Sequence, residues 1–346
     1  MKYNDEKKYI GNRSQLLRAM RVQLQEGKAK GVEMVDVQNS SGMHFDINLS
    51  RGMDIPFLDF EGQNFGFLSP CGIVAPQYFD DKELGFLKSF TCGFLTTCGL
   101  KMAGAPCEYE GQSYGLHGNA SHTPAEEVTC ILCEDEEVPY IRITGKIRDA
   151  IIFGDKLVLE REIKCYYKER KISVRDKVIN EGYKKARHMI VYHCNLGYPL
   201  LSDNSEIFIP STSVRARNAH AQEGIDVWMK VENPNPDYEE MCYYHDMKKD
   251  ENNMSTAAIF NPDLNMGVAI EFDTDSLDHF VQWKMMGAGD YVMGLEPANA
   301  TIDGMKDAVE NKSMKYIEPG EYIEHYLNFY VLSNEEEMKQ IKEKFN

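Results

Sequence analysis

Two alternating runs joined by a short polar turn decide the fold class of this 346-residue chain. They read KLVLEREIKCY at residues 156–166 and KISVRDKVIN at residues 171–180. Apolar side chains recur at every second position, which is typical of antiparallel strands with one buried face. If Cys165 faces Ile172, then Arg161 faces Asp176 on that apolar face. We predict a cross-strand ion pair there, because either charge alone would be costly to bury. The alternative is that both charges lie in water at a sheet rim.

The same period of two recurs along the chain, for example in Phe45–Leu49, in Ile141–Ile143 and over residues 323–331. Turn residues separate these runs, and neither a βαβ alternation nor a Gly-rich phosphate loop is present in the sequence. The pattern therefore predicts an all-β protein built from antiparallel sheets, with residues 1–346 forming a single domain.

One helix is expected, at the C-terminus. Ser333 followed by Glu336 fits a capping box, and three glutamates place negative charge in the first turn. Met338, Ile341 and Phe345 then recur at helical spacing, so the helix should pack on the outside of the sheets.

Composition narrows the classes of partner. The chain carries 38 Lys and Arg against 55 Asp and Glu, a net charge of −17. This argues against a nucleic-acid backbone or an anionic membrane as the main partner. No apolar run resembles a signal peptide or a membrane span. The nine cysteines are scattered, and the Cys130–Cys133 pair lacks the second pair of a zinc site. We expect a cytoplasmic protein with reduced thiols, and a homodimer is compatible with this composition.

Three short stretches carry candidate chemistry: GLHGN at 115–119, YHCNLG at 192–197 and GLEPAN at 294–299. Each places one ionisable side chain, His117, His193 or Glu296, among small, turn-forming or apolar residues. Two imidazoles and a carboxylate can move two protons near neutral pH. The unperturbed pKa of histidine is ~6.5, and burial raises the pKa of glutamate above its unperturbed value of ~4.3. Taken singly, each of the three is more often structural than catalytic. The other histidines lack comparable surroundings and are assigned structural roles.

These stretches, together with SRGMDI at 50–55, FLTTCGL at 94–100 and QWK at 282–284, give the chain a family likeness. It resembles the aldose 1-epimerase (galactose mutarotase-like) superfamily, most closely a bacterial branch of largely unassigned function. The resemblance implies a large antiparallel β-supersandwich with a sugar in an open cleft. It also implies that His117 binds and polarises the sugar, His193 is the general acid toward the ring oxygen, and Glu296 is the general base toward the anomeric hydroxyl.

Further sugar contacts are expected from Arg51, Glu240, Gln282 and Lys284. Members of the superfamily carry an aspartate between the second histidine and the glutamate; here Glu240 is favoured over Asp237 and Asp246 for that place. Lys284 would suit an acidic substituent, and Trp283 offers a stacking face. Both could equally be packing or surface residues.

The expected function is interconversion of the α and β anomers of a sugar by acid–base ring opening, with no metal or cofactor. Three alternatives stay open. The same fold could bind sugars without turnover, two histidines and a glutamate could form a facial metal site, and a glycosidase would use carboxylates for the same work.

Overall fold

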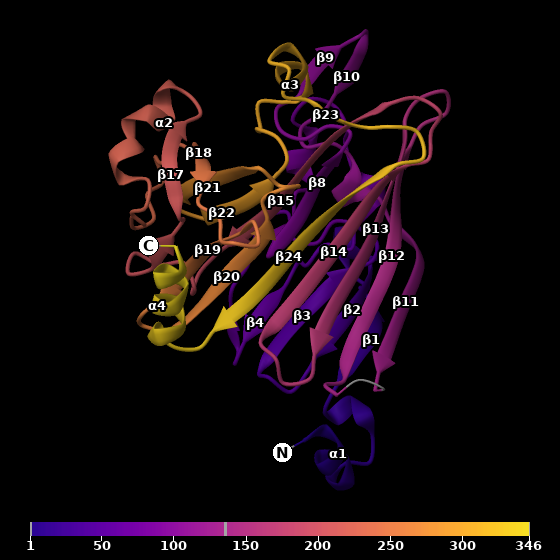
Figure 1. The fold of residues 1–346 in the computed structure, drawn as a ribbon, viewed down its shortest axis with the longest axis vertical. Helices are drawn as coiled ribbons and strands as arrows, with labels where there is room; N and C mark the ends of the chain where they lie inside the picture. Colours follow the sequence, from indigo (N-terminus) through magenta and orange to yellow (C-terminus); the bar gives the residue numbers. More distant parts are fainter. Residues whose placement is uncertain (1, 135–136, 346) are drawn as a thin grey trace.

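The computed structural model describes residues 2–134 and 137–345, and strands dominate it (Figure 1). The larger of its two main layers is an eight-stranded sheet with antiparallel neighbours. In spatial order its strands are β11 (Ala125–Cys133), β12 (Tyr140–Ala150), β13 (Lys156–Tyr166), β14 (Lys171–Asn180), β24 (Tyr322–Leu332), β20 (Met266–Asp273), β19 (Met254–Asn261) and β16 (Glu206–Phe208).

A seven-stranded sheet forms the second main layer. It contains β17 (Ser211–Ala216), β18 (Met241–Met247), β21 (His279–Gly287), β22 (Asp290–Ala298), β15 (Ala186–Leu196) and β23 (Lys315–Ile317) in that order, and β8 (Leu95–Leu100) also pairs with β15. A five-stranded sheet runs β1 (Arg18–Gln23), β2 (Glu33–Gln38), β3 (Met43–Asn48), β4 (Leu58–Phe60) and β5 (Gln63–Asn64). The small pairs are β6 (Phe67–Leu68) with β7 (Cys92–Gly93) and β9 (Cys107–Tyr109) with β10 (Gln112–Tyr114).

Helices are few and short. The α-helices among the described residues are α1 (Tyr3–Glu6), α2 (Ala219–Glu223), α3 (Met305–Glu310) and α4 (Glu335–Lys344), and the other helical segments are single 3-10 turns. The prediction of an all-β fold with a C-terminal helix is confirmed. No helix in residues 2–134 and 137–345 is long and apolar enough to cross a membrane.

Strand alternation gives the seven-stranded sheet two different faces. On β15, Tyr192 and Cys194 enter the main hydrophobic core together with side chains of the eight-stranded sheet. Met189 and Val191 instead join a second cluster on the opposite face of β15. His193 has the same parity as this second set, so it also lies on the side away from the main core.

The predicted ion pair between Arg161 and Asp176 is confirmed, with the register that the sequence indicated. Arg161 Nε donates to Asp176 Oδ1 at 2.9 Å and Nη2 donates to Oδ2 at 2.6 Å, and both side chains are fully buried. The guanidinium also donates to Thr97 Oγ1 and to the Gly52 carbonyl oxygen, while the Tyr192 hydroxyl donates to Asp176. Because every charge has partners, this cluster joins the two main sheets without an orphaned group.

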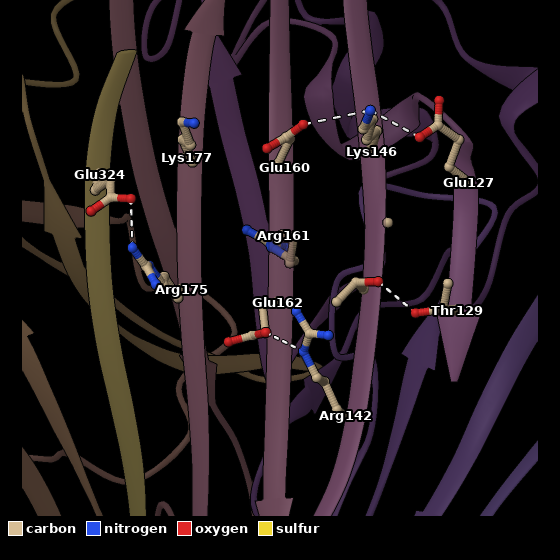
Figure 2. A pocket seen from close by; sticks show the side chains of 12 residues that line it. Glu127, Thr129, Arg142, Lys146, Glu160, Arg161, Glu162, Arg175, Lys177 and Glu324 are labelled. Atoms are coloured by element: carbon tan, nitrogen blue, oxygen red, sulfur yellow. Dashed lines mark hydrogen bonds and ion pairs between the residues drawn. The ribbon is translucent and has the colours of Figure 1, made fainter. Parts of the chain in front are cut away.

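The outer face of the eight-stranded sheet carries a hollow of about 510 Å³ above Gly145 (Figure 2). Its walls are lateral ion pairs: Lys146 lies 2.8 Å from Glu127 and 3.5 Å from Glu160, and Arg175 donates to Glu324 at 2.7 Å. These charges neutralise one another along the strands, so the hollow is a solvated, self-compensated surface rather than a cavity that calls for a ligand.

Helix α4 packs its Met338 against Phe260 and Leu332, outside the sheets as expected. Its cap differs from the prediction by one residue. Asn334, not Ser333, is the N-cap: its side-chain oxygen accepts from the Glu337 N–H at 3.0 Å. The Glu337 carboxylate accepts a hydrogen bond from the Ser333 N–H at 2.9 Å. The capping residues are therefore Asn334 and Glu337, one position after the predicted Ser333 and Glu336.

We expect Asp176→Asn to lower the free energy of unfolding by about 3–5 kcal/mol, because it removes the bidentate counter-charge of buried Arg161 and leaves only Asp54, 3.3 Å from Nη1. Urea denaturation monitored by tryptophan fluorescence would measure this. Arg175→Gln, on the outer face, is the control and should change stability by less than about 0.5 kcal/mol. A loss below about 1 kcal/mol for Asp176→Asn would show that the pair is not buried as described.

The cap assignment gives a second expectation. Asn334→Ala should cost about 1 kcal/mol of stability because it removes the acceptor of the Glu337 N–H. Ser333→Ala keeps the backbone N–H that Glu337 accepts from, and it should cost less than about 0.5 kcal/mol. Equal losses in the two variants, measured by thermal or urea unfolding, would contradict the assignment.

Candidate functional site

His193 and Glu296 face each other across two paired strands. The register of β15 with β22 sets Cys194 opposite Leu295 and Asn195 opposite Gly294, which places His193 opposite Glu296. His193 Nε2 lies 3.4 Å from Glu296 Oε1, and the two side chains are 6% and 1% exposed. Two of their buried polar atoms, His193 Nδ1 and Glu296 Oε1, have no hydrogen-bond partner among the described residues. Buried groups left in this state are characteristic of functional sites.

Gly294 makes room for the Glu296 carboxyl group. A Cβ atom at position 294 would lie 2.3 Å from Glu296 Oε1 and 2.9 Å from the Cβ of Trp283. The glycine that opens the third motif is therefore required by space, since any side chain would push the carboxyl group from its place beside His193.

His117 reaches the same region from a loop. Its φ of +60° is uncommon for a residue with a side chain. Its N–H donates to the Gly104 carbonyl oxygen at 3.0 Å, and the Gly104 N–H donates to its Nδ1 at 3.3 Å. Because Nδ1 accepts, the neutral ring carries its proton on Nε2. The ring centroids of His117 and His193 are 5.6 Å apart.

All three side chains line one cavity of about 280 Å³, which suits a ligand of monosaccharide size. Glu240 and Trp283 stand on its wall, and the Trp283 indole N–H donates to Glu240 Oε2 at 2.7 Å. The remaining lining residues are Leu84, Leu87, Phe90, Gly104, Ala105, Pro106, Leu116, Arg217, Cys242 and Ile302.

Burial controls the protonation of the site. It lowers the pKa of His193 to about 3, with a smaller contribution from His117, and that of His117 to about 4, so both rings are neutral at pH 7. Burial raises the pKa of Glu296 well above its usual value, Glu240 raises it further, and Arg217 lowers it. Without a ligand, burial thus favours the uncharged forms of both groups, a carboxylic acid beside a neutral imidazole.

Gln282 and Lys284 do not line this cavity, and the expectation that they contact a sugar there is corrected. They alternate with Trp283 along β21, so they point to the opposite face of the sheet. The Gln282 amide donates to the Trp228 carbonyl oxygen at 2.9 Å, and Lys284 Nζ lies 2.8 Å from Glu232.

Arg51 does not line the cavity either. Its guanidinium is buried, donates to the carbonyl oxygens of Ser121 and Ser89 at 2.9 and 2.7 Å, and lies 2.7 Å from His122 Nε2. Arg51 therefore anchors the segment that follows the His117 loop. Its guanidinium donors are used by protein acceptors and are not available to bind a sugar.

The three candidate carboxylates before and along β18 occupy different places relative to the cavity. Glu240 stands on the cavity wall, as favoured from the sequence. Asp237 lies in an exposed loop, and exposed Asp246 accepts a hydrogen bond from the Ser213 hydroxyl. Arg217 also lines the cavity but was missed, because the residues around it form no motif. Only the pairing of β17 with β18 brings it there.

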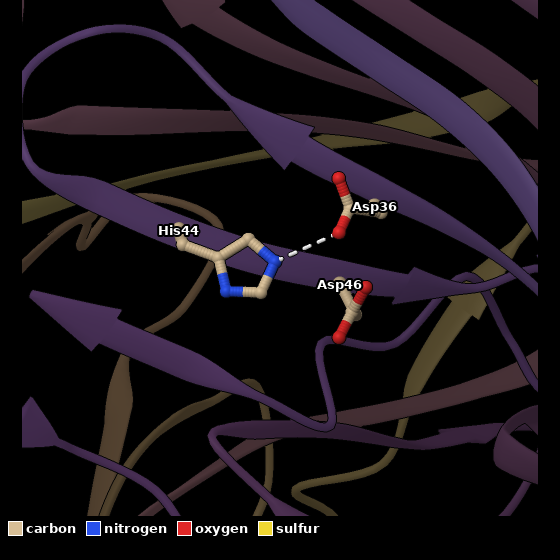
Figure 3. A group of neighbouring side chains, drawn as sticks. All are labelled: Asp36, His44 and Asp46. Atoms are coloured by element: carbon tan, nitrogen blue, oxygen red, sulfur yellow. Dashed lines mark hydrogen bonds and ion pairs between the residues drawn. The ribbon is translucent and has the colours of Figure 1, made fainter. Parts of the chain in front are cut away.

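The geometry does not favour a facial metal site. Among the described residues, the set of three potential ligand atoms lying within 4.8 Å of one another is Asp36, His44 and Asp46 (Figure 3). Even there, His44 Nδ1 lies 2.8 Å from Asp59 and Nε2 lies 3.1 Å from Asp36. Burial lowers the pKa of His44, but the hydrogen bonds to these two carboxylates raise it by more, so both ring nitrogens are already engaged by carboxylates rather than free to bind a metal.

Comparisons with known proteins place the fold of the chain. The family model described as "Domain of unknown function (DUF4432)" matches residues 29–331. The crystal structure of a proposed aldose 1-epimerase from Klebsiella pneumoniae is similar over 95% of this chain and 88% of that chain, with 25% identity and a TM-score of 0.90. Galactose 1-epimerase from Lactobacillus acidophilus is similar over 92% and 99%, with 12% identity and a TM-score of 0.60.

A galactose mutarotase-like protein from Clostridium acetobutylicum is similar over 92% of this chain and 99% of that chain, with 12% identity and a TM-score of 0.61. No curated protein sequence matches the chain. The fold is therefore galactose mutarotase-like, as the sequence motifs predicted.

We expect Gly294→Ala to move the Glu296 carboxyl group away from His193 while the sheet itself persists, because the closer clash, at 2.3 Å, falls on the end of a flexible side chain and the contact with Trp283 Cβ at 2.9 Å is milder. A crystal structure of the variant should show the Nε2–Oε1 distance increased from 3.4 Å to beyond ~4 Å. Gly11→Ala, whose added Cβ would meet no atom within 4 Å, is the control. An unmoved carboxyl group would contradict this account of the glycine.

Proposed function

The chain belongs to the family described as "Domain of unknown function (DUF4432)", and we propose that it is a mutarotase that interconverts the α and β anomers of a free aldose. The observation that carries the proposal is the facing pair of His193 and Glu296, 3.4 Å apart on the wall of a cavity of monosaccharide size. Mutarotation requires one proton donor and one proton acceptor, and this pair supplies both.

The reaction balances with those two groups alone. The O1–H bond breaks and its proton passes to one member of the pair, while the O1–H electrons form the C1=O1 double bond. The C1–O5 bond cleaves with its electrons on O5, which takes the proton of the other member. Rotation about C1–C2 then presents the other face of the aldehyde, and the reverse steps close the ring. Each group changes role between opening and closure.

The resemblance noted from the sequence makes Glu296 the base and His193 the acid. Burial favours the opposite start in the ligand-free protein, because it raises the pKa of Glu296 and keeps His193 uncharged. Groups this close titrate as a unit, so we assign the acid–base work to the pair and not to fixed single roles. His117, with its proton on Nε2, would donate to a sugar oxygen, and Glu240 would accept from a hydroxyl.

The test is an exchange-NMR screen of anomer interconversion across neutral, acidic and phosphorylated aldoses. We expect one aldose or more to be accelerated by the wild type, and Glu296→Gln and His193→Ala each to lose about 10²–10⁴-fold of that acceleration. Glu160→Gln on the outer face of the large sheet is the matched control and should retain full activity.

Binding measured on the same samples separates catalysis from sugar sensing. Glu296→Gln preserves the shape of the carboxyl group, so it should still bind the accelerated sugar. If a sugar binds tightly but its interconversion rate is the same with wild type and with Glu296→Gln, the protein is a sugar-binding protein and the mutarotase proposal fails.

A further inference from the structure

Arg217 is the single arginine or lysine among the described residues that line the cavity. It follows directly after β17, and its Nε donates to Asp303 Oδ1 at 3.0 Å while Nη2 donates to the Ile302 carbonyl oxygen at 3.4 Å. The second oxygen of Asp303 accepts from the Tyr244 hydroxyl at 2.7 Å. These contacts fix the guanidinium on the cavity wall, where the Arg217 side chain is 25% exposed.

A positive charge at this place offsets an energetic difficulty of the acid–base pair. Glu296 is almost completely buried, and a carboxylate without a cation is unfavourable there. Glu240 on the same wall makes the ionised form of Glu296 less favourable still and raises its pKa, whereas the Arg217 guanidinium favours the ionised form and lowers that pKa. The same guanidinium also lowers the pKa of His117, after burial, so its field reaches both sides of the cavity.

The other titratable groups around Glu296 cannot supply this compensation. The thiols of Cys98 and Cys194 are neutral, because burial raises their pKa well above the usual value. Lys284 on the neighbouring strand is paired with Glu232 behind the sheet. The titratable groups on the described elements packed against Glu296 are His117, His193, Cys92, Cys98, Cys194, Cys242, Glu240, Lys284 and Arg217.

We propose that Arg217, held by Asp303, is a positioning residue that stabilises negative charge on Glu296 while a sugar proton is transferred. The inference rests on the proposed mutarotation, in which Glu296 is ionised in one half of the cycle and protonated in the other. Without Arg217, the ionised half is disfavoured and the exchange of roles within the pair is slowed.

The experiment titrates Glu296 directly in the full chain. Protein labelled with ¹³C at glutamate carboxyl carbons is followed by NMR between pH 4 and 9, and the Glu296 signal is assigned by its loss in Glu296→Gln. We expect the midpoint of Glu296 to rise by about one pH unit in Arg217→Gln and by less in Arg217→Lys, which keeps the charge. Arg175→Gln removes an equal charge from the far sheet and should leave the midpoint unchanged.

Where a sugar is interconverted, the acidic limb of kcat/KM against pH should shift upward with the NMR midpoint in Arg217→Gln and be partly restored in Arg217→Lys. A purely structural Arg217–Asp303 pair would lower the melting temperature and leave both midpoints in place, which would overturn the proposal. So would a Glu296 that does not ionise below pH 9 in the wild type. If no sugar is accelerated, mutarotation fails, while the titration still decides whether Arg217 governs Glu296.

Discussion

Strand alternation across the β15–β22 pair is the constraint on which the site depends. Successive side chains of a strand must point to opposite faces of the sheet. Tyr192 and Leu295 therefore enter the main core, and their neighbours His193 and Glu296 emerge together on the other side. The hydrophobic burial that holds the two main sheets together thereby also fixes the distance between the side chains of His193 and Glu296. A slip of one residue in this pairing would turn one of the two groups toward the core and separate it from the other.

The β15–β22 strand pair borders buried polar groups of two kinds, one on each of its faces. On the core side, Arg161 and Asp176 satisfy each other and their neighbours through several hydrogen bonds. On the cavity side, His193 Nδ1 and Glu296 Oε1 lack partners among the described residues. The first arrangement is what stability requires, and the second keeps polar atoms available for a ligand. The contrast separates a fully satisfied ion pair of the eight-stranded sheet from a partly unsatisfied pair of the seven-stranded sheet.

The alternation of apolar residues was sufficient to predict the antiparallel fold and the register of β13 with β14, because a hairpin register depends on neighbouring residues. The motifs also led to His117, His193 and Glu296, whose side chains line one cavity. Gln282 and Lys284 were misplaced because the face a strand residue occupies depends on which distant strand pairs with it. Arg51 was misplaced because its acceptors are carbonyl oxygens, which leave no mark in the sequence.

Sheet order has a consequence for synthesis of the chain. Strand β24, close to the C-terminus, lies between β14 and β20 in the middle of the eight-stranded sheet. A nascent polypeptide therefore exposes two unpaired apolar edges until residues 322–332 have left the ribosome. Unpaired edges of this kind template aggregation. We therefore expect the chain to require chaperones until β24 has been synthesised and has paired with β14 and β20. Truncation of the last strand would leave the same two edges open permanently.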